Sequence, residues 1–373
     1  MAHESKMDAP SRNAVFSFFS GAGFLDLGFE EAGFETVFAN EINKEFVAGY
    51  LHSRKAMGKP VPRHGVACCS IDEMLQTPKS HDLRDAVIAS RSRGQTIGFI
   101  GGPPCPDFSV GGKNRGQAGD HGRLSRSYVD LVIEQQPDWF VFENVKGLWR
   151  TKQHREFFDR LVNDLNAAGF KTDAKLMNSI EFGAPQDRDR IILFGVNRNF
   201  AEARSLSISS FNWNVSVKYP ERTAFRYNWP ARSSFGSAIE QSPVPQELTI
   251  QHWFEKNQVG THPNAPHRFS PRAALPRFLS IEEGDVGKKC FKRLHRQRYS
   301  PTACYGNNEV HLHPTEARRL SVAESLAIQS LPREFELPSS MTLSAMFKTV
   351  GNGVPFVMAQ GIAKSVLSFI GQP

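Results

Sequence analysis

The chain has 373 residues, 40% of them hydrophobic and 22% charged, which is ordinary for a globular protein and allows one large domain plus a smaller one. No apolar run reaches membrane-spanning length and the first residues are polar, so we expect no transmembrane segment, no signal peptide and a cytoplasmic location. Five cysteines without paired spacing argue against a disulfide framework and a structural zinc site, while the net charge of +7 permits a polyanionic partner.

The first clear pattern is a strand, a glycine turn and a helix near the amino terminus. An apolar run, 15–19, leads into Ser20-Gly21-Ala22-Gly23, where glycines let a ligand approach the backbone closely. Asp26 stands where a dinucleotide fingerprint would have its third glycine, which weakens an NAD interpretation. A second strand, 36–39, precedes Glu41, and this carboxylate is placed either to bind ribose hydroxyls or to lie on the surface.

A rigid turn that carries a cysteine follows the next apolar run. Residues 97–100 predict a buried strand, and Gly101-Gly102-Pro103-Pro104 then force an abrupt turn with Cys105 at its tip. The loop 110–123 is basic and rich in glycine. This arrangement indicates a nucleophile under a lid, and the alternative is a small buried cysteine beside a surface loop.

Strand and helix patterns alternate up to residue 197. We expect a third strand that ends near 69–72, helices at 128–136 and 156–168, and strands at 139–142 and 191–196. This alternation predicts an α/β fold with a mostly parallel sheet. Glu143 directly follows a buried strand, so it is expected at the ligand-binding edge of that sheet.

The alternation stops after Asn197. Residues 198–300 lack periodicity and are rich in Ser, Pro, Arg and aromatic residues, and basic residues crowd their end. Aromatic residues interleaved with the basic ones favour nucleic-acid contact over a merely solvated charged surface. Helical patterns return at 321–329, and a final amphipathic helix ends at Ile370.

Six motifs in this order resemble those of the C5-cytosine DNA methyltransferase family. Phe19–Gly23 looks like the family's S-adenosylmethionine turn, Pro104-Cys105 like its nucleophile motif, and Glu143–Val145 matches its ENV motif. The remaining matches are Gln186, Arg188 and Arg190 for the QxRxR motif, Arg318, Glu324, Gln329 and Pro332 for the ninth motif, and Gly351–Pro355 for the last one.

The resemblance implies a Rossmann-like S-adenosylmethionine-dependent methyltransferase fold with a mostly parallel sheet, plus a smaller target-recognition domain. On this basis 1–197 is the catalytic and cofactor-binding domain, and 198–300 is the target-recognition domain. Residues 301–373 then complete the catalytic domain. Since 198–300 lies outside the resemblance, no target sequence follows from it.

The resemblance also implies roles for individual residues. As thiolate, Cys105 adds to C6 of cytosine, because C5 alone is a poor nucleophile. Glu143 hydrogen-bonds N3 and the exocyclic amine, and Arg190 holds O2. Arg188 either supports the structure of the site or contacts a phosphate. The alternative for both arginines is an ion pair with Asp187 or Asp189.

S-adenosylmethionine is the implied methyl donor, without a metal. In the common family pattern an aspartate contacts the adenine, but Ser70 stands at that position here, with Asp72 two residues later. The loop to Arg123 would close over a flipped base, with phosphate contacts from Lys113, Arg115 and Arg123. The implied cofactor residues are Phe19, Ser20, Gly21, Ala22, Gly23, Phe24, Leu25, Glu41, Ile42, Ile71, Pro104, Asn352 and Val354.

We therefore expect a DNA (cytosine-5)-methyltransferase that acts as a monomer on double-stranded DNA and protects it from a cognate restriction endonuclease. One alternative is a tRNA cytosine-5 methyltransferase. Another is a catalytically silent DNA-binding protein, which would not need Cys105, Glu143 and Arg190 together. A redox cysteine protein is disfavoured, because no resolving cysteine is evident.

Overall fold

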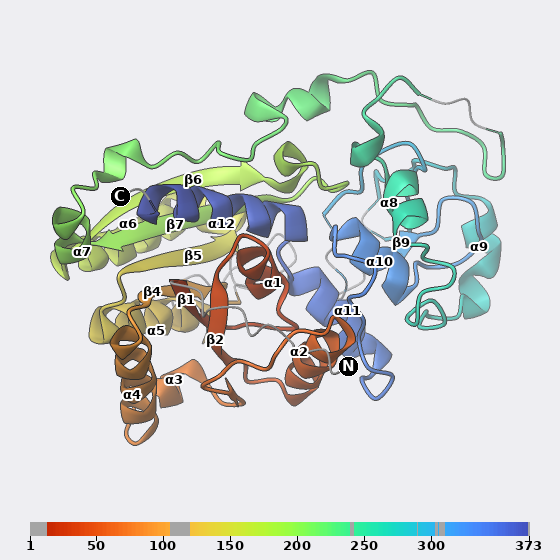
Figure 1. The fold of residues 1–373 in the computed structure, drawn as a ribbon. Coiled ribbons are helices and arrows are strands. Elements are labelled where there is room, and N and C mark those ends of the chain that lie inside the picture. Colours follow the sequence, from red (N-terminus) through yellow and green to blue (C-terminus); the bar gives the residue numbers. More distant parts are fainter. Residues whose placement is uncertain are drawn as a thin grey trace, which may run out of the picture.

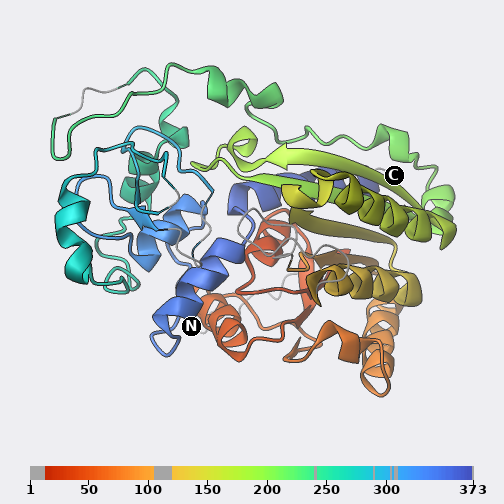
Figure 2. The ribbon, with the colours of Figure 1, turned by 180° about the vertical axis from the view of Figure 1, so that it is seen from behind.

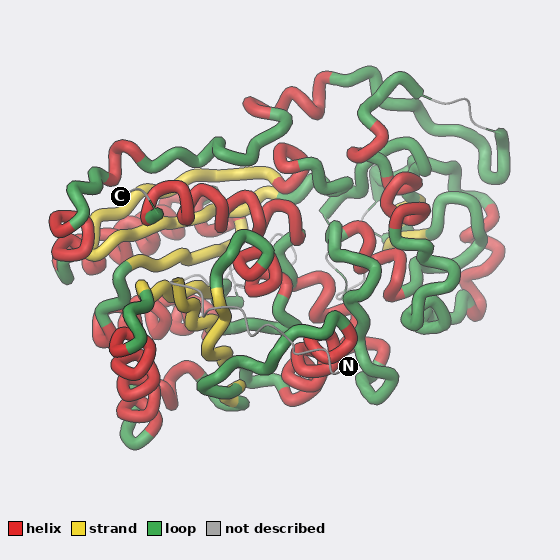
Figure 3. The backbone as a smooth tube through the Cα atoms, viewed as in Figure 1, coloured by secondary structure: helices red, strands yellow, loops and turns green. Residues whose placement is uncertain are grey.

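The computed structural model describes residues 13–104, 120–238, 242–288, 290–302, 305 and 310–371. Cys105, Lys113, Arg115 and Cys304 lie outside the described residues, as does most of the predicted lid. Two lobes lie side by side, one built around a sheet and the other made largely of loops and short helices (Figures 1 and 3).

The first lobe contains a seven-stranded sheet in the order β3-β2-β1-β4-β5-β7-β6. The pairs from β3 to β5 are parallel, and β7 runs antiparallel to both of its neighbours. The predicted mostly parallel sheet is therefore confirmed. The strands are β1 (Asn13–Phe18), β2 (Glu35–Asn40), β3 (Val66–Ala67), β4 (Thr96–Gly101), β5 (Trp139–Val145), β6 (Phe170–Asn178) and β7 (Asp189–Asn197).

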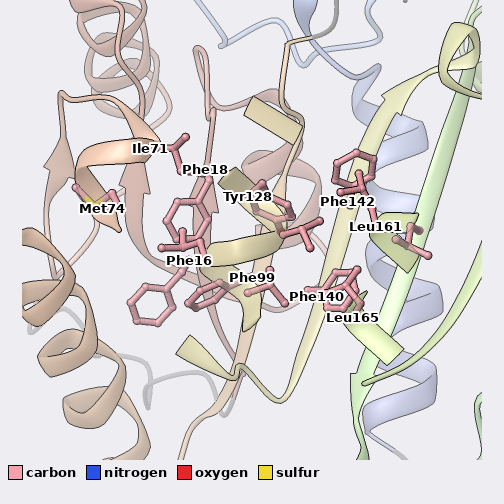
Figure 4. Close-up of a cluster of buried hydrophobic side chains, with 14 of the residues drawn as sticks. Phe16, Phe18, Ile71, Met74, Phe99, Tyr128, Phe140, Phe142, Leu161 and Leu165 are labelled. Atoms are coloured by element: carbon pink, nitrogen blue, oxygen red, sulfur yellow. The ribbon is translucent and has the colours of Figure 1, made fainter. Parts of the chain in front are cut away.

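Helices cover both faces of this sheet, so its central strands are apolar on both sides. Phe16, Phe18 and Phe99 belong to the core on one face (Figure 4). Val15 and Trp139 belong to the core on the other. The first face is covered by α3 (Ile71–Met74), α4 (Lys79–Ser92), α5 (Asp120–Gln135) and α6 (Lys152–Ala167), the second by α1 (Phe24–Glu30), α7 (Arg198–Ala203) and α12 (Phe356–Ile370).

The register of the sheet brings the ends of four strands to one edge. Phe18 at the end of β1 lies opposite Asn40 of β2 on one side and Gly101 of β4 on the other. Gly101 in turn lies opposite Phe142 of β5. The residues that follow these strands therefore meet at the same carboxyl edge, where open α/β sheets bind ligands.

The second lobe is attached to the first through a continuous apolar core. Ile250 and Trp253 of α8 (Ile250–Lys256) share a core cluster with Phe24 of the first lobe. The lobe also contains α9 (Leu275–Leu279), β8 (Lys292–Arg293), β9 (His311–Leu312) and α10 (Val322–Ile328), while α11 (Leu343–Asn352) and α2 (Lys44–Ala56) lie between the lobes (Figures 1 and 2). Short 3₁₀ helices complete the chain: η2 (Lys146–Trp149), η3 (Ser179–Phe182), η4 (Ile208–Ser210), η5 (Pro220–Arg226), η6 (Gln246–Leu248) and η7 (Arg272–Ala274).

One stretch, Leu343–Ile370, is long and apolar enough to cross a membrane. However, 61% of its most apolar window is buried inside the protein. Gly353, Val354 and Pro355 also divide it into α11 and α12. The stretch therefore belongs to the core of the fold.

The prediction of the third strand is wrong in its position. β3 ends at Ala67, and residues 71–74 form α3 instead. The reason is a capping box: the Ser70 hydroxyl accepts from the backbone N–H of Asp72, and the Glu73 carboxylate accepts from the N–H of Ser70 at 3.0 Å. The sequence patterns also missed β6, because an edge strand with half-exposed polar residues shows no apolar run.

Candidate active site

The turn after β1 has the geometry of a ligand-binding loop. Gly21 and Gly23 adopt φ values of 56° and 88°, which glycine reaches without steric cost. Gly23 donates to the carbonyl of Ser20 at 2.8 Å, which closes the turn. The buried Ser20 hydroxyl has no hydrogen-bond partner among the described residues, so it is available to a polar ligand group.

Glu41 lies at the end of β2, directly beside this turn. One carboxylate oxygen accepts from the N–H of Gly21 at 3.0 Å, and the other accepts from the N–H of Asn43 at 2.8 Å. Burial raises the pKa of Glu41, although these two backbone donors partly counteract the effect. Glu41 thus braces the turn, and its remaining lone pairs can accept from hydroxyl groups. The next residue, Ile42, is 63% exposed and offers an apolar surface at the same edge.

The carboxyl-terminal motif reaches the same turn from the far end of the chain. A Cβ placed on Gly353 would lie 2.1 Å from the ring of Phe24, so only glycine allows this contact. A Cβ on Gly21 would lie 3.7 Å from the hydroxyl of Thr349 in α11. Val354 is buried in the core that contains Leu25, whereas Asn352 is exposed at the end of α11. Residues 19–25 and 349–354 therefore form one surface.

The segment after β3 begins with a buried apolar side chain and an engaged carboxylate. Ile71 is only 2% exposed and packs in the core of the first sheet face (Figure 4). Asp72 accepts from Ser127 at 2.6 Å and pairs with Arg123. Burial opposes ionisation of Asp72, but these hydrogen bonds outweigh it and lower its pKa. Arg123, predicted as a phosphate contact, is therefore engaged by a carboxylate in this structure.

Glu143 stands beside the turn that leads to Cys105. A Cβ on Gly102 would lie 2.6 Å from Oε2 of Glu143, so this glycine lets the carboxylate lie against the turn. The Asn144 amide donates to the carbonyl of Pro103 at 3.4 Å, which ties the same turn to β5. Pro104, a predicted cofactor residue, is the last described residue before Cys105 and is exposed. Sequence reasoning did not identify Gly102 or Asn144 as positioning residues, since only contacts reveal that role.

Arg190 and Glu143 form a buried ion pair across β5 and β7. Arg190 lies opposite Val145 in the register, and its Nε is 2.6 Å from Oε1 of Glu143. Each side chain is 9% exposed. Neither of these two atoms has an aligned hydrogen bond among the described residues, although Nη1 of Arg190 donates to the carbonyl of Asp189. A buried pair without aligned hydrogen bonds has capacity left for a polar ligand.

Arg188 lies just before β7 and is oriented toward α11. Its Nη2 donates to the carbonyl of Gly351 at 2.7 Å, which holds the end of α11 against β7. Gln186 and Gln329 act in the same region, since Gln186 donates to Gln329 at 3.2 Å and Gln329 to the carbonyl of Val350. These side chains join the motif before β7 to the last motif of the chain.

The ninth motif contributes to the framework of the second lobe. Arg318 binds Glu324 through two hydrogen bonds of 2.9 and 2.7 Å. Glu324 also caps α10, because it accepts from the N–H of Ser321 at 2.7 Å. These contacts explain the residue types at these positions without a ligand.

The edge therefore has two halves: a glycine turn with Glu41 after β1 and β2, and a Glu143–Arg190 pair on β5 and β7 beside the turn before Cys105. The unpartnered Ser20 hydroxyl, the Glu41 carboxylate and the exposed Ile42 fit the amino-acid, ribose and adenine parts of S-adenosylmethionine. Among the described residues no cluster of His, Cys, Asp or Glu could hold a metal ion.

The chain belongs to the C-5 cytosine-specific DNA methylase family, whose sequence model matches residues 14–368. It is 53% identical over 360 residues to the Type II methyltransferase M.NmeDI of Neisseria meningitidis serogroup C. This match covers 96% of this chain and 84% of that protein. It is 28% identical over 363 residues to the Type II methyltransferase M.MthTI of Methanothermobacter thermautotrophicus. This match covers 94% of this chain and 96% of that protein.

Two solved structures have the same fold. A candidate DNA modification methyltransferase encoded within a prophage of E. coli superposes with a TM-score of 0.64 at 21% identity, covering 96% of this chain and 99% of that chain. The S. pombe Dnmt2 methyltransferase superposes with a TM-score of 0.58 at 13% identity, covering 95% and 98%. Its family and its 53% identity to a Type II methyltransferase show that the protein is an enzyme, a DNA (cytosine-5)-methyltransferase.

Proposed function

We propose that this enzyme methylates cytosine within a specific sequence of duplex DNA and thereby protects that sequence from a cognate restriction endonuclease. The observation that carries the proposal is the shared edge: the turn that would hold the methyl donor follows β1, the pair that would hold the base lies on β5 and β7, and β4 with the turn before Cys105 lies between β1 and β5. Identity to relatives named Type II methyltransferases supports the setting of a restriction system.

The proposed cofactor site consists of the turn 19–25, Glu41, Ile42 and the surface around Asn352. S-adenosylmethionine supplies an electrophilic methyl group when it is bound. Ser20 and the backbone of the glycine turn would hold its polar groups, and Glu41 would accept hydrogen bonds from its ribose hydroxyls. Ile71 and Val354 support this site from the core rather than by offering surface to the cofactor.

The proposed roles at the base follow from the chemistry of the side chains. As thiolate, Cys105 would add to C6, and this addition turns the ring into an enamine that is nucleophilic at C5. Glu143 would hydrogen-bond the amine and place a proton at N3 as the thiolate adds, and Arg190 would hold O2. Because Glu143 and Arg190 already touch, the pair needs only a small reorientation to bracket a base. Arg188 is proposed as a positioning residue for α11.

A base within a duplex cannot reach this buried pair, so the target cytosine must leave the helix, at a cost of about a few kcal/mol. Residues 198–300, with their basic and aromatic composition, are proposed to select the target sequence. We propose that the enzyme acts as a monomer in the cytoplasm.

Methylation mapping tests this function. Genomic DNA from cells that express the protein, or its Cys105→Ala variant, is sequenced by a method that reads 5-methylcytosine. We expect one short sequence to be methylated at the same cytosine throughout the genome, and only with the unaltered protein. Labelled methyl groups found in tRNA instead of DNA would replace this proposal with the tRNA alternative.

A further inference from the structure

A pocket of about 490 Å³ lies between the segment just before β7 and η5, outside the proposed catalytic pair. It is lined by Asp187, just before β7, and by Glu221, Arg222, Phe225 and Arg226 of η5. It is a depression largely open to solvent rather than an enclosed cavity. The turn before β7 and η5 thus face each other across a space that can admit a chemical group.

This pocket is connected to the catalytic pair by a short series of contacts. Arg222 pairs with Asp189 at 2.5 Å, and Asp189 also accepts from Lys146 at 2.7 Å. The adjacent Arg190 contacts Glu143 on the other side of the strand. The pocket is therefore linked to Glu143 through Asp189 and the adjacent Arg190, and it is separate from the site of the base.

The lining has the chemistry of a site for a phosphate and the sugar attached to it. Arg222 and Arg226 are both exposed, and the guanidinium of Arg222 lies 5.3 Å from the ring centroid of Phe225. Arginine donors match phosphate oxygens geometrically, and an aromatic ring packs against a sugar. The carboxylates of Asp187 and Glu221 repel an anion, which confines it to the arginine side of the pocket.

The backbone of η5 is held in place despite an uncommon conformation. Glu221 and Arg222 have φ values of 52° and 59°, where residues other than glycine are uncommon. The carbonyl of Glu181 in η3 accepts from the N–H groups of Lys218 and Tyr219, and its carboxylate accepts from the N–H of Arg222 at 3.1 Å. These contacts fix the two arginines relative to β7.

Arg222 can exchange partners without leaving Asp189 unpaired. The Asp189 carboxylate also accepts from Asn178 at 2.9 Å and from Lys146. Burial acts to raise the pKa of Asp189, but these contacts outweigh burial and the pKa is lowered. If Arg222 turned to a phosphate, Asp189 would keep two partners. The exchange therefore costs less than breaking an isolated buried pair.

We propose that this pocket binds a backbone phosphate of the methylated strand next to the target cytosine, through Arg222 and Arg226, with Phe225 against the adjoining sugar. The proposal rests on the proposed DNA-methylating function of the neighbouring site. It adds a contact that anchors the strand on one side of the flipped nucleotide. Arg226 is the better residue to test, because among the described residues its side chain makes only a long hydrogen bond, 3.4 Å, to the carbonyl of Glu221 in its own turn.

The test uses duplexes that contain the target found by methylation mapping, each with one neutral methylphosphonate within three nucleotides of the target cytosine. Fluorescence anisotropy gives the dissociation constant for the unaltered protein, Arg226→Gln, Arg226→Lys and the control Arg84→Gln. Arg84 is a suitable control because its side chain is 53% exposed, close to the 48% of Arg222. Its helix α4 lies at the end of the molecule away from the second lobe (Figure 1).

We expect a methylphosphonate at one position to weaken binding of the unaltered protein about tenfold. The Arg226→Gln variant should bind that duplex and the unmodified duplex with the same affinity. Arg226→Gln should also lower the slope of log K against log salt by about one, while Arg226→Lys keeps the slope. If Arg226→Gln behaves like Arg84→Gln and no position couples to it, the proposal is overturned. That result would leave the methylation map unaffected, so failure of the inference is distinguishable from failure of the proposed function.

Discussion

Gly102→Ala should disable catalysis through a single steric contact. The added Cβ would lie 2.6 Å from Oε2 of Glu143, whereas ordinary contact begins at 3.4 Å. Either the carboxylate or the turn before Cys105 must therefore move by about 0.8 Å. Misplacement of a catalytic group by about 1 Å costs up to about a hundredfold in rate, so we expect kcat to fall by about one to two orders of magnitude.

Single-turnover transfer of labelled methyl groups to target DNA measures this loss, and calorimetry measures the affinity for S-adenosylmethionine, which should stay the same. Gly260→Ala is the matched control, because a Cβ there meets no atom within 4 Å. In a Glu143→Ala background, Gly102→Ala should have little further effect, since the clashing carboxylate is absent. Full activity of Gly102→Ala, or an equal loss in both backgrounds, would refute the argument that this contact positions the site.

Three further predictions concern cofactor, stability and specificity. Glu41→Ala should weaken S-adenosylmethionine binding about tenfold to a hundredfold and leave DNA binding nearly unchanged. The reason is that the ribose and the N–H groups of Gly21 and Asn43 lose a charged acceptor. An unchanged affinity for S-adenosylmethionine by calorimetry would contradict the role of Glu41 in cofactor binding. Burial, with a contribution from Glu30, raises the pKa of Asp26 from 3.8 to about 6. Between these values the folded state binds more protons, so wild-type stability should fall by about 2 kcal/mol relative to Asp26→Asn from pH 4 to pH 7; urea unfolding that shows a constant difference would refute it. Grafting residues 198–300 into a relative should transfer the methylated sequence, and an active chimera that keeps its parent's target would show that specificity lies elsewhere.

Much of the fold was predictable because its strands are buried on both faces and appear as continuous apolar runs. β1, β4, β5 and β7 have this property, and each lies close to its predicted position. β6 does not, since it lies at the sheet edge. The start of α3 depends on a capping box at Ser70, a local signal that competes with the apolar pattern around it.

The site was predictable as a set of residue types at strand ends, but their contacts were not. The sequence placed Glu41 and Glu143 after strands, and the structure shows them at one edge. It could not show that Arg188 holds the carbonyl of Gly351 while Arg190 contacts Glu143, because both partners are distant in the chain. The two arginines differ in their place in the chain, since Arg188 lies just before β7 and Arg190 lies within it.

The central claim is that Cys105 bonds covalently to the target base, and a mechanism-based adduct tests it directly. A duplex with 5-fluorocytosine at the mapped target is incubated with the enzyme and S-adenosylmethionine, and the product is denatured and mapped by peptide mass spectrometry. After methyl transfer the fluorine cannot leave as a cation, so the enzyme should remain attached to DNA through Cys105, and Cys105→Ser should form no adduct. Attachment through Cys68, Cys69, Cys290 or Cys304, or an undiminished adduct with Cys105→Ser, would contradict the account.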